Sequence, residues 1–200
     1  MDVAEAICAK PAGHLTDDRS LSNLLDVSTK TDTFDLVGLR MTSGEGRKFD
    51  LTVAIEPYEL GQDTYTVLPA EIPAELQISR TTAQGYALRL RFEASLDGAC
   101  MRCLEPTTVS FVVDSREVSQ PGANPGDELD SPYVSDGTLA LAAWARDALA
   151  LVMPAALLCK PDCAGLCAVC GTDLNSAGAD HHHESEPDSR WAKLSELKFD

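Results

Sequence analysis

The segment Cys159-Lys-Pro-Asp-Cys163-Ala-Gly-Leu-Cys167-Ala-Val-Cys170-Gly171 places four cysteines within twelve residues, directly after an apolar stretch ends. Four thiolates this close together are best explained by one shared metal ion, because Zn²⁺ prefers four tetrahedral soft ligands at about 2.3 Å. In the Cys-x-x-Cys-Gly form, the glycine lets the chain reverse while backbone N–H groups point at the sulfurs. The sequence therefore predicts a structural zinc site formed by Cys159, Cys163, Cys167 and Cys170. Disulfides, a thiol redox switch or plain buried cysteines are the alternatives.

A second pair, Cys100 and Cys103, lies upstream, and spacing alone leaves two groupings open. In the favoured grouping, the four downstream cysteines form a self-contained site, because local ligands close shorter loops. The upstream pair is then a second metal-binding or thiol pair. In the other grouping, the upstream pair joins Cys167 and Cys170 across 63 intervening residues. Two ions are also compatible with six clustered cysteines and the run His181-His-His183, in which one histidine is a candidate ligand and a solvated run is the simpler interpretation.

Composition indicates a globular chain. Its 200 residues are 44% apolar and 6% aromatic, which suffices for a modest core in one or two domains. The first residues lack the basic and apolar run of a secretory signal. The longest apolar stretch, 148–159, contains Pro154 and is far shorter than the ~20 residues that span a bilayer. We therefore expect a cytoplasmic protein without membrane contact. Thiols stay reduced in that compartment, which favours metal ligation over disulfides, and the leftover Cys8 needs no partner.

Alternation of apolar and polar residues predicts an antiparallel β domain over residues 34–118. Residues 34–40 and 49–55 have this pattern and flank Gly44-Glu-Gly46, which predicts a hairpin. Residues 65–68 predict a short edge strand, stopped by the prolines that follow.

The clearest strand pair is 76–81 followed by 86–96. One face of the second strand carries Tyr86, Leu88, Leu90, Phe92, Ala94 and Leu96, and the other carries Ala87, Arg89, Arg91, Glu93 and Ser95. We expect the first face to be core and the second to be partly basic. Because residues 107–113 are typical of a returning strand, the Cys100–Cys103 pair is expected to cap a hairpin.

The remaining segments differ from this pattern. Residues 1–33 are polar and predict a flexible arm, and the acidic residues 119–137, rich in proline and glycine, predict a loop. Residues 138–200 are expected to hold a helix, the cysteine-rich metal-binding segment and a short C-terminal helix. The expected fold class is therefore α+β: mainly an antiparallel β-sheet or small barrel, followed by a helix, a Cys-rich zinc knuckle and a short C-terminal helix.

The predicted helix has a period close to 3.6. Asp136 or Thr138 is the expected N-cap, and Pro154 ends the helix after about Met153. Its apolar stripe is expected to pack on the core, and comprises Leu141, Trp144, Ala148, Leu151 and Val152. The C-terminal helix is expected near residues 188–197.

Charge is distributed unevenly. The chain has 16 basic and 32 acidic residues, a net charge of -16, and a uniformly acidic surface repels nucleic acid. Residues 76–120 alone are balanced, with five of each sign. The candidate RNA-binding residues are therefore Arg89, Arg91 and Arg102. Arg102 lies between two cysteines, where a guanidinium can stabilise thiolates or hold a phosphate.

Several segments together resemble the YceD family, the large ribosomal RNA subunit accumulation proteins. They are Cys100-Met-Arg-Cys-Leu-Glu-Pro106, the helix end Leu151-Val-Met-Pro154, residues 158–175, and Asp188-Ser-Arg-Trp-Ala-Lys-Leu194. The resemblance spans roughly residues 34–198 and is most specific over the first and third of these segments. It implies a bacterial cytoplasmic factor, without catalytic activity, linked to maturation or accumulation of large-subunit ribosomal RNA.

The favoured function is a non-catalytic factor in ribosome biogenesis that supports large-subunit (23S) rRNA processing or accumulation and carries a structural zinc site. Its expected partners are the rRNA precursor or ribosomal proteins, and no small-molecule substrate is expected. An enzyme is disfavoured, because a zinc deaminase needs His-x-Glu ahead of Pro-Cys-x-x-Cys and an all-sulfur zinc site is structural. The alternative is a zinc-binding protein-interaction adaptor without direct RNA contact, which the acidic charge favours.

Overall fold

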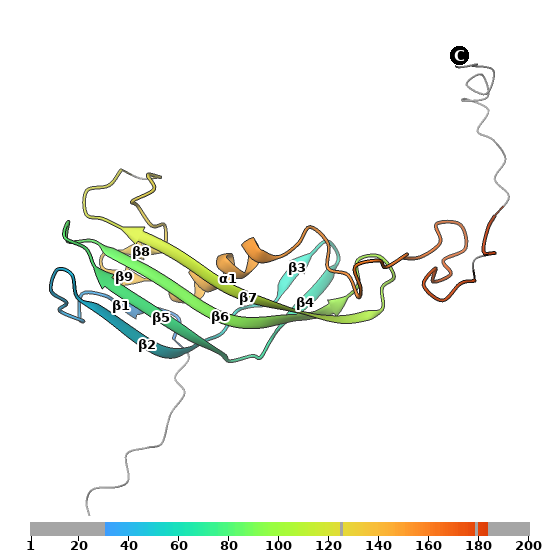
Figure 1. The fold of residues 1–200 in the computed structure, drawn as a ribbon, viewed down its shortest axis with the longest axis horizontal. Helices are drawn as coiled ribbons and strands as arrows, with labels where there is room; N and C mark the ends of the chain where they lie inside the picture. Colours follow the sequence, from blue (N-terminus) through green and yellow to red (C-terminus); the bar gives the residue numbers. More distant parts are fainter. Residues whose placement is uncertain (1–30, 125, 179, 184–200) are drawn as a thin grey trace, which may run out of the picture.

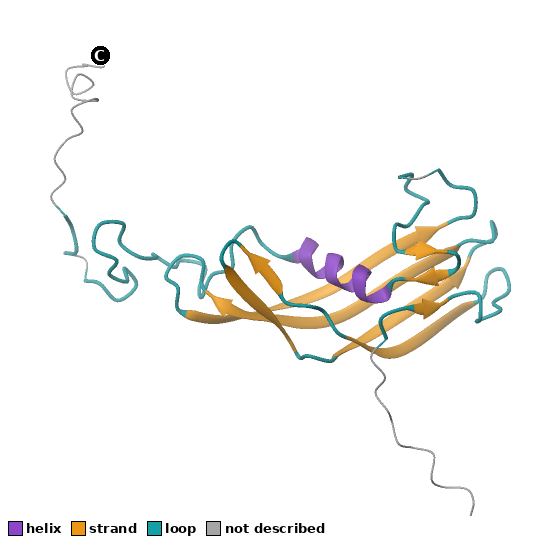
Figure 2. Cartoon of the chain, turned by 180° about the vertical axis from the view of Figure 1, so that it is seen from behind, coloured by secondary structure: helices purple, strands orange, loops and turns teal. Residues whose placement is uncertain are grey.

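The computed structural model describes residues 31–124, 126–178 and 180–183. Within these ranges, a six-stranded antiparallel sheet carries one helix on one of its faces (Figure 1, Figure 2). The strands of the large sheet are β2 (Gly46–Val53), β3 (Tyr58–Leu60), β4 (Asp63–Leu68), β5 (Ile72–Arg80), β6 (Tyr86–Ala99) and β7 (Pro106–Ser119). A smaller sheet is formed by β1 (Phe34–Asp35), β8 (Val134–Ser135) and β9 (Thr138–Leu139), and the helix is α1 (Leu141–Val152). The mainly antiparallel β architecture expected from the sequence is confirmed.

The large sheet is organised around β6. β7 pairs with β6 along its whole length, from Tyr86 opposite Ser119 to Ala99 opposite Pro106. The other edge of β6 is shared, because β5 pairs with its first half and β4 with its last part. β2 extends the sheet beyond β5, and β3 extends it beyond β4. Over the described strands this order is an open path, so the architecture is a sheet rather than a barrel.

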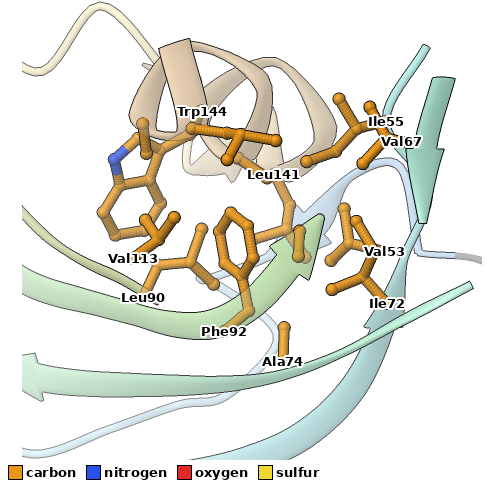
Figure 3. Close-up of a cluster of buried hydrophobic side chains, with 14 of the residues drawn as sticks. Val53, Ile55, Val67, Ile72, Ala74, Leu90, Phe92, Val113, Leu141 and Trp144 are labelled. Carbon is orange, nitrogen blue, oxygen red and sulfur yellow. The ribbon is translucent and has the colours of Figure 1, made fainter. Parts of the chain in front are cut away.

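The main core lies between the sheet and α1. The inward face of β6 is buried as its alternation predicts, with Leu88, Leu90, Phe92, Ala94 and Leu96 each at most 5% exposed. Trp144 of α1 packs over this face beside Leu90 and Val113 (Figure 3). Its indole Nε1 donates a hydrogen bond to Ser115 Oγ at 3.0 Å, so its polar atom is paired as well. Helix α1 thus covers the inner face of the sheet, and within the described residues no helix packs on the opposite face.

The N-terminal strands differ from the predicted hairpin. Residues 34–35 pair with 138–139 in the small sheet, whereas β2 pairs with β5. The turn at Gly44 contacts the end of β5 instead, through hydrogen bonds from Gly44 N to Arg80 O and from Arg80 N to Glu45 O. Likewise, β4 is an inner strand with β3 outside it, so the predicted edge position of 65–68 is wrong. The alternation located the strands correctly but not their partners.

At the N-terminus of α1, a backbone carbonyl rather than the expected side-chain cap accepts a hydrogen bond from a free N–H group. Its N-cap residue is Ala140, and neither Asp136 nor Thr138 caps it within the described part of the chain. Instead the Ala142 N–H, which has no acceptor inside the first helical turn, donates to Asp32 O at 3.1 Å. Thr31 N donates to Thr52 O, so the last residues of the predicted arm lie against the sheet. Residues 1–30 lie outside the described residues.

The predicted apolar stripe of the helix is correct at three of its five positions. Leu141, Trp144 and Ala148 are buried, but Leu151 is 84% exposed and Val152 is 41% exposed. Ala145 and Leu149 fill the core instead. The predicted C-terminal helix near 188–197 lies outside the described residues. No helix in the described ranges combines the length and the apolar character needed to cross a membrane.

Candidate metal centre

Four cysteines from two distant parts of the chain meet at the end of the sheet. Cys100 and Cys103 lie in the turn between β6 and β7, and Cys159 and Cys163 follow α1. Their sulfurs all lie within 4.8 Å of one another; we call this set the first group. The segment after α1 reaches the hairpin turn, where Met101 N donates to Leu157 O at 2.9 Å (Figure 1). The hairpin turn expected for Cys100 and Cys103 therefore places this pair next to Cys159 and Cys163.

The sulfur spacing in the first group fits a metal ion. Cys100 Sγ lies 3.8 Å from Cys163 Sγ, and Cys103 Sγ lies 3.6 Å from Cys159 Sγ. A tetrahedral ion with metal–sulfur bonds of about 2.3 Å places its sulfurs roughly 3.8 Å apart. A disulfide requires about 2.05 Å, and all four cysteines are free thiols. The sulfur positions of the first group are thus compatible with one shared metal ion.

The surroundings of the first group stabilise negative charge on sulfur. Three of its four cysteines are buried, with Leu158 and Leu166 packed against them. Burial tends to raise the pKa of the Cys100 thiol, but backbone N–H groups, first those of Cys103 and Arg102, outweigh it and lower the pKa to about 6. A thiolate is the form that ligates a metal, so the turn presents Cys100 in the ligating form near neutral pH.

Two side chains outside the ligand set hold its loops in place. Arg102 Nη1 donates to Cys163 O at 2.9 Å, and Arg102 O accepts from Leu166 N at 3.2 Å. Asn175 Oδ1 accepts from Ala164 N at 2.9 Å, while its Nδ2 lies 3.5 Å from Cys163 Sγ. Arg102 therefore clamps the second cysteine loop onto the hairpin turn. Asn175 was not among the sequence-derived candidates; the polar turn Gly171-Thr-Asp-Leu-Asn175 directly after the cysteines was its only signal.

The remaining two cysteines meet two histidines. The ligand atoms of Cys167, Cys170, His181 and His183 lie within 4.8 Å of one another; we call this set the second group. Cys170 Sγ lies 3.6 Å from His181 Nε2, and the rings of His181 and His183 are in edge-to-face contact. The neighbouring sulfurs of Cys170 and Cys167 raise the pKa of His183.

The structure therefore divides the cysteines differently from either sequence-derived grouping. The favoured set Cys159, Cys163, Cys167 and Cys170 is split between the two groups, and Cys100 and Cys103 join the first half of it. The alternative set, in which Cys167 and Cys170 complete the upstream pair, is not brought together either. The physical reason is that the hairpin turn of β6 and β7 reaches the residues directly after α1.

The three candidate RNA-binding arginines lie in two places. Arg89 and Arg91 project from the face of β6 opposite α1, whereas Arg102 lies in the hairpin turn between Cys100 and Cys103 and donates to Cys163 O. Arg89 makes two hydrogen bonds to Asp114, at 2.7 and 2.6 Å, and Arg91 Nε lies 3.6 Å from the same carboxylate. On the same face, Lys48 Nζ lies 2.6 Å from Glu75 Oε2. This outer face therefore carries alternating charges rather than an uninterrupted basic patch.

A known protein family matches the part of the chain that carries these features. The sequence model described as "Large ribosomal RNA subunit accumulation protein YceD" matches residues 88–198. The chain belongs to this family. The matched range includes most of β6, all of β7 and α1, and every member of both groups, so all candidate ligands fall in the part that matches the family. The family expected from the motifs is thus confirmed over residues 88–198, whereas the resemblance expected from residue 34 onward is not matched before residue 88.

Mycobacterial relatives are also similar to this YceD chain. An uncharacterized protein of Mycobacterium bovis and one of Mycobacterium tuberculosis are each 36% identical to it over 121 residues, which is 58% of this chain and 58% of each relative. An uncharacterized protein of Mycobacterium leprae is 40% identical over 65 residues, covering 32% of this chain and 29% of the relative. The chain therefore spans less than two thirds of the length of these relatives. No solved structure matches the chain.

Proposed function

We propose that this protein is a non-catalytic, cytoplasmic factor in ribosome biogenesis that supports processing or accumulation of the large-subunit rRNA, with a structural zinc ion in the first group. The observation that carries the proposal is the match of the YceD family over residues 88–198. The family's description refers to accumulation of large-subunit ribosomal RNA, and both cysteine groups fall inside the matched range.

The chemistry of the first group supports a structural role for its ion. Four sulfurs complete the tetrahedron that Zn²⁺ prefers, so no coordination position is left for water or substrate. Catalytic zinc keeps such an open position. Two of its cysteines lie in the hairpin turn and two follow α1, and Arg102 in the turn donates to the Cys163 carbonyl, so the two segments are already held together. The ion would join the hairpin turn to the chain after α1.

The energy available from such an ion is large compared with the local contacts. Structural zinc contributes an apparent ~10–16 kcal/mol in zinc-finger peptides. The first group has only Leu158 and Leu166 packed against its buried cysteines. Apolar packing on that scale cannot fix the segment by itself, because small cores contribute little. We therefore assign the ion the role that a hydrophobic core has elsewhere in the chain.

The outer face of the sheet is the proposed contact with RNA. Arg89 and Arg91 are already paired with Asp114, so RNA phosphates would compete with that carboxylate for the same guanidinium groups. Such competition favours a selective contact over indiscriminate binding, because the net charge of -16 repels RNA elsewhere. Ribosomal proteins, which present basic surfaces to an acidic chain, are the second expected class of partner.

The test is co-purification of RNA and protein partners with the tagged chain, expressed in its native cells. The tagged full chain is expected to retain precursor large-subunit rRNA or large-subunit proteins at moderate salt, and its depletion is expected to lower the level of mature large-subunit rRNA. Unchanged large-subunit rRNA after depletion, together with no retained precursor or ribosomal protein, would overturn the proposal.

A zinc-binding adaptor without RNA contact is the second candidate, and the pairing of Arg89 and Arg91 with Asp114 favours it. The variant Arg89→Glu/Arg91→Glu separates the two candidates, with Arg40→Glu/Arg47→Glu as the matched control of equal charge change at exposed positions. Under the RNA-binding proposal only the first variant loses the rRNA precursor. Retention of the precursor by both variants, with protein partners still bound, establishes the adaptor.

A further inference from the structure

We infer that Cys167, Cys170, His181 and His183 form a second zinc site, separate from the ion in the first group. The ligand atoms of these four residues lie within 4.8 Å of one another. For a tetrahedral ion with zinc–sulfur bonds of about 2.3 Å and zinc–nitrogen bonds of about 2.0–2.1 Å, a sulfur and a nitrogen lie roughly 3.6 Å apart. Cys170 Sγ and His181 Nε2 are 3.6 Å apart.

The backbone around the two cysteines has the form of a metal-binding knuckle. Gly171 N donates to Cys167 O at 2.8 Å and closes the turn. Gly171 itself has φ = +73°, a conformation that favours glycine. The N–H groups of Cys170 and Val169 are directed at the Cys167 sulfur. A turn that directs N–H groups at a sulfur stabilises the thiolate that a metal needs, and nothing in an ordinary surface turn requires this.

Every second histidine of the run 181–183 is directed at the site. His181 and His183 belong to the second group, whereas His182 Nδ1 lies 2.7 Å from Asp180 O and is not a member. In an extended run, side chains at i and i+2 lie on the same side of the chain. The run His181-His-His183 therefore supplies two ligands and one residue directed away from them, and this makes His182 a natural internal control.

Within the described part of the chain, the segment after the first group has little apolar packing beyond Leu166, which lies against the buried cysteines. Among the described residues, the buried core cluster of the main domain includes none after Leu157. Residues 164–178 are held by turn hydrogen bonds such as Cys167 N to Thr172 O and Leu174 N to Gly165 O, both 2.8 Å. A segment of this size without a core depends on a metal or disulfides for its structure, and Cys167 and Cys170 are free thiols. An ion in the second group meets this requirement.

The two sites differ in charge and access. Two thiolates and two neutral imidazoles balance the charge of Zn²⁺, whereas the four thiolates of the first group exceed it by two. Cys170 and His183 are exposed and Cys167 and His181 are partly buried, while three of the four first-group cysteines are buried. We therefore expect the second ion to exchange faster and to be removed by a weaker chelator.

The experiment measures metal content of the purified full chain after zinc loading and removal of free metal. The wild type is expected to hold two zinc ions per chain, His181→Ala/His183→Ala one, and the control His182→Ala two. Cys100→Ser/Cys163→Ser is expected to hold one ion, and that ion should be lost when the two histidine substitutions are added. A wild type that holds a single ion, kept in Cys100→Ser/Cys163→Ser and lost in His181→Ala/His183→Ala, would contradict the proposed structural zinc of the first group but not the second site.

Cobalt substitution gives a second readout, because the spectrum reports which kinds of atom ligate the ion. The Co²⁺ form of the wild type minus that of His181→Ala/His183→Ala should give the spectrum of a tetrahedral ion with two sulfur ligands, with weaker sulfur-to-metal charge transfer than the remaining four-sulfur site. A wild type that holds no ion, or a histidine double variant that keeps as many ions as the wild type, would overturn the inference.

Discussion

Asn175 connects the first group to the turn that follows the last cysteine. Its Oδ1 accepts from Ala164 N, and its Nδ2 donates to Asp173 Oδ1 at 2.7 Å while lying 3.5 Å from Cys163 Sγ. An amide donor next to a ligating sulfur orients the ligand and offsets part of its charge. The residue therefore affects metal affinity without touching the ion.

We predict that Asn175→Ala weakens zinc binding at the first group by roughly 10–100-fold, the range typical of lost partners around metal ligands. The measurement is competition with a chromophoric chelator on the full chain. Ser176→Ala is the matched control, because the exposed Ser176 hydroxyl donates to Asp173 O at 3.1 Å rather than to a cysteine of the first group. Equal affinities for the wild type and Asn175→Ala would contradict the assigned role.

Asp114 makes the free energy of unfolding depend on pH in the acidic range. Its hydrogen bonds with Arg89 hold its pKa below the ordinary value. A depressed pKa in the folded state means that the stabilisation is fully present above the unfolded pKa, about 3.9, and is lost as the pH falls through the folded value. Asp114→Asn should therefore be slightly less stable than the wild type at pH 7, and the difference should vanish in acid.

Urea unfolding at a series of pH values measures this difference for Asp114. Because the pair is on the surface, the expected effect at neutral pH is small. Asp50→Asn removes the same charge from the same face, where the Asp50 carboxylate is 85% exposed and 3.9 Å from Lys48 Nζ. A pH dependence that is the same in both variants would show that the Arg89 pair is not its source.

The individual ligands show what spacing can and cannot establish. The clustering of cysteines identified candidate ligands but not which of them meet, because loop-closure entropy alone favours neighbours in sequence over distant pairs. The free-energy cost of loop closure changes by only ≈0.6 kcal/mol per doubling of loop length, which is small beside the binding free energy of an ion. Because β6, β7 and α1 already bring Cys100 and Cys163 together, the distant pairing adds little further entropy cost.

At the level of elements, α1 stabilises the sheet mainly through Trp144. Its side chain is 1% exposed, and its indole N–H is paired with Ser115. We predict that Trp144→Ala lowers the free energy of unfolding by about 3–5 kcal/mol, because it leaves a large cavity between helix and sheet. Leu151→Ala, on the same helix at 84% exposure, should change it by less than about 0.5 kcal/mol. Chemical denaturation compares the two, and similar losses would mean that α1 does not pack as described.

The strands differ in how far the sequence determines their partners. β6 alternates over its whole length and is bounded by turns on both sides, so its buried face followed from the residues alone. The pairing of β1 with β9 joins residues about a hundred positions apart, and two-residue strands have no periodicity of their own. Sequence order favoured a hairpin between 34–40 and 49–55, whereas the sheet places β2 against β5. Local patterns thus predicted the elements, and long-range packing selected their neighbours.

The whole molecule combines two modes of stabilisation. The sheet and α1 share one apolar cluster that runs from Leu36 to Leu157, whereas the three buried cysteines form a separate small cluster with Leu158 and Leu166. The two clusters meet where Met101 N donates to Leu157 O and where the Leu157 N–H lies 3.3 Å from Met101 Sδ. The sheet can therefore keep its structure when the metal-dependent part loses its own.

We predict that a strong chelator leaves the far-ultraviolet circular dichroism of the sheet and helix largely unchanged at 25 °C but abolishes amide protection at the hairpin turn and after α1. The N–H groups concerned include those of Met101 and Leu166, whose acceptors lie across the first group. Because the ions bind the native state only, their removal also lowers the melting temperature of the sheet. Cys100→Ser/Cys163→Ser should reproduce the loss of protection around the first group without chelator. If protection and melting temperature stay unchanged in the metal-free chain, burial alone holds the C-terminal segment and the ions have no structural role.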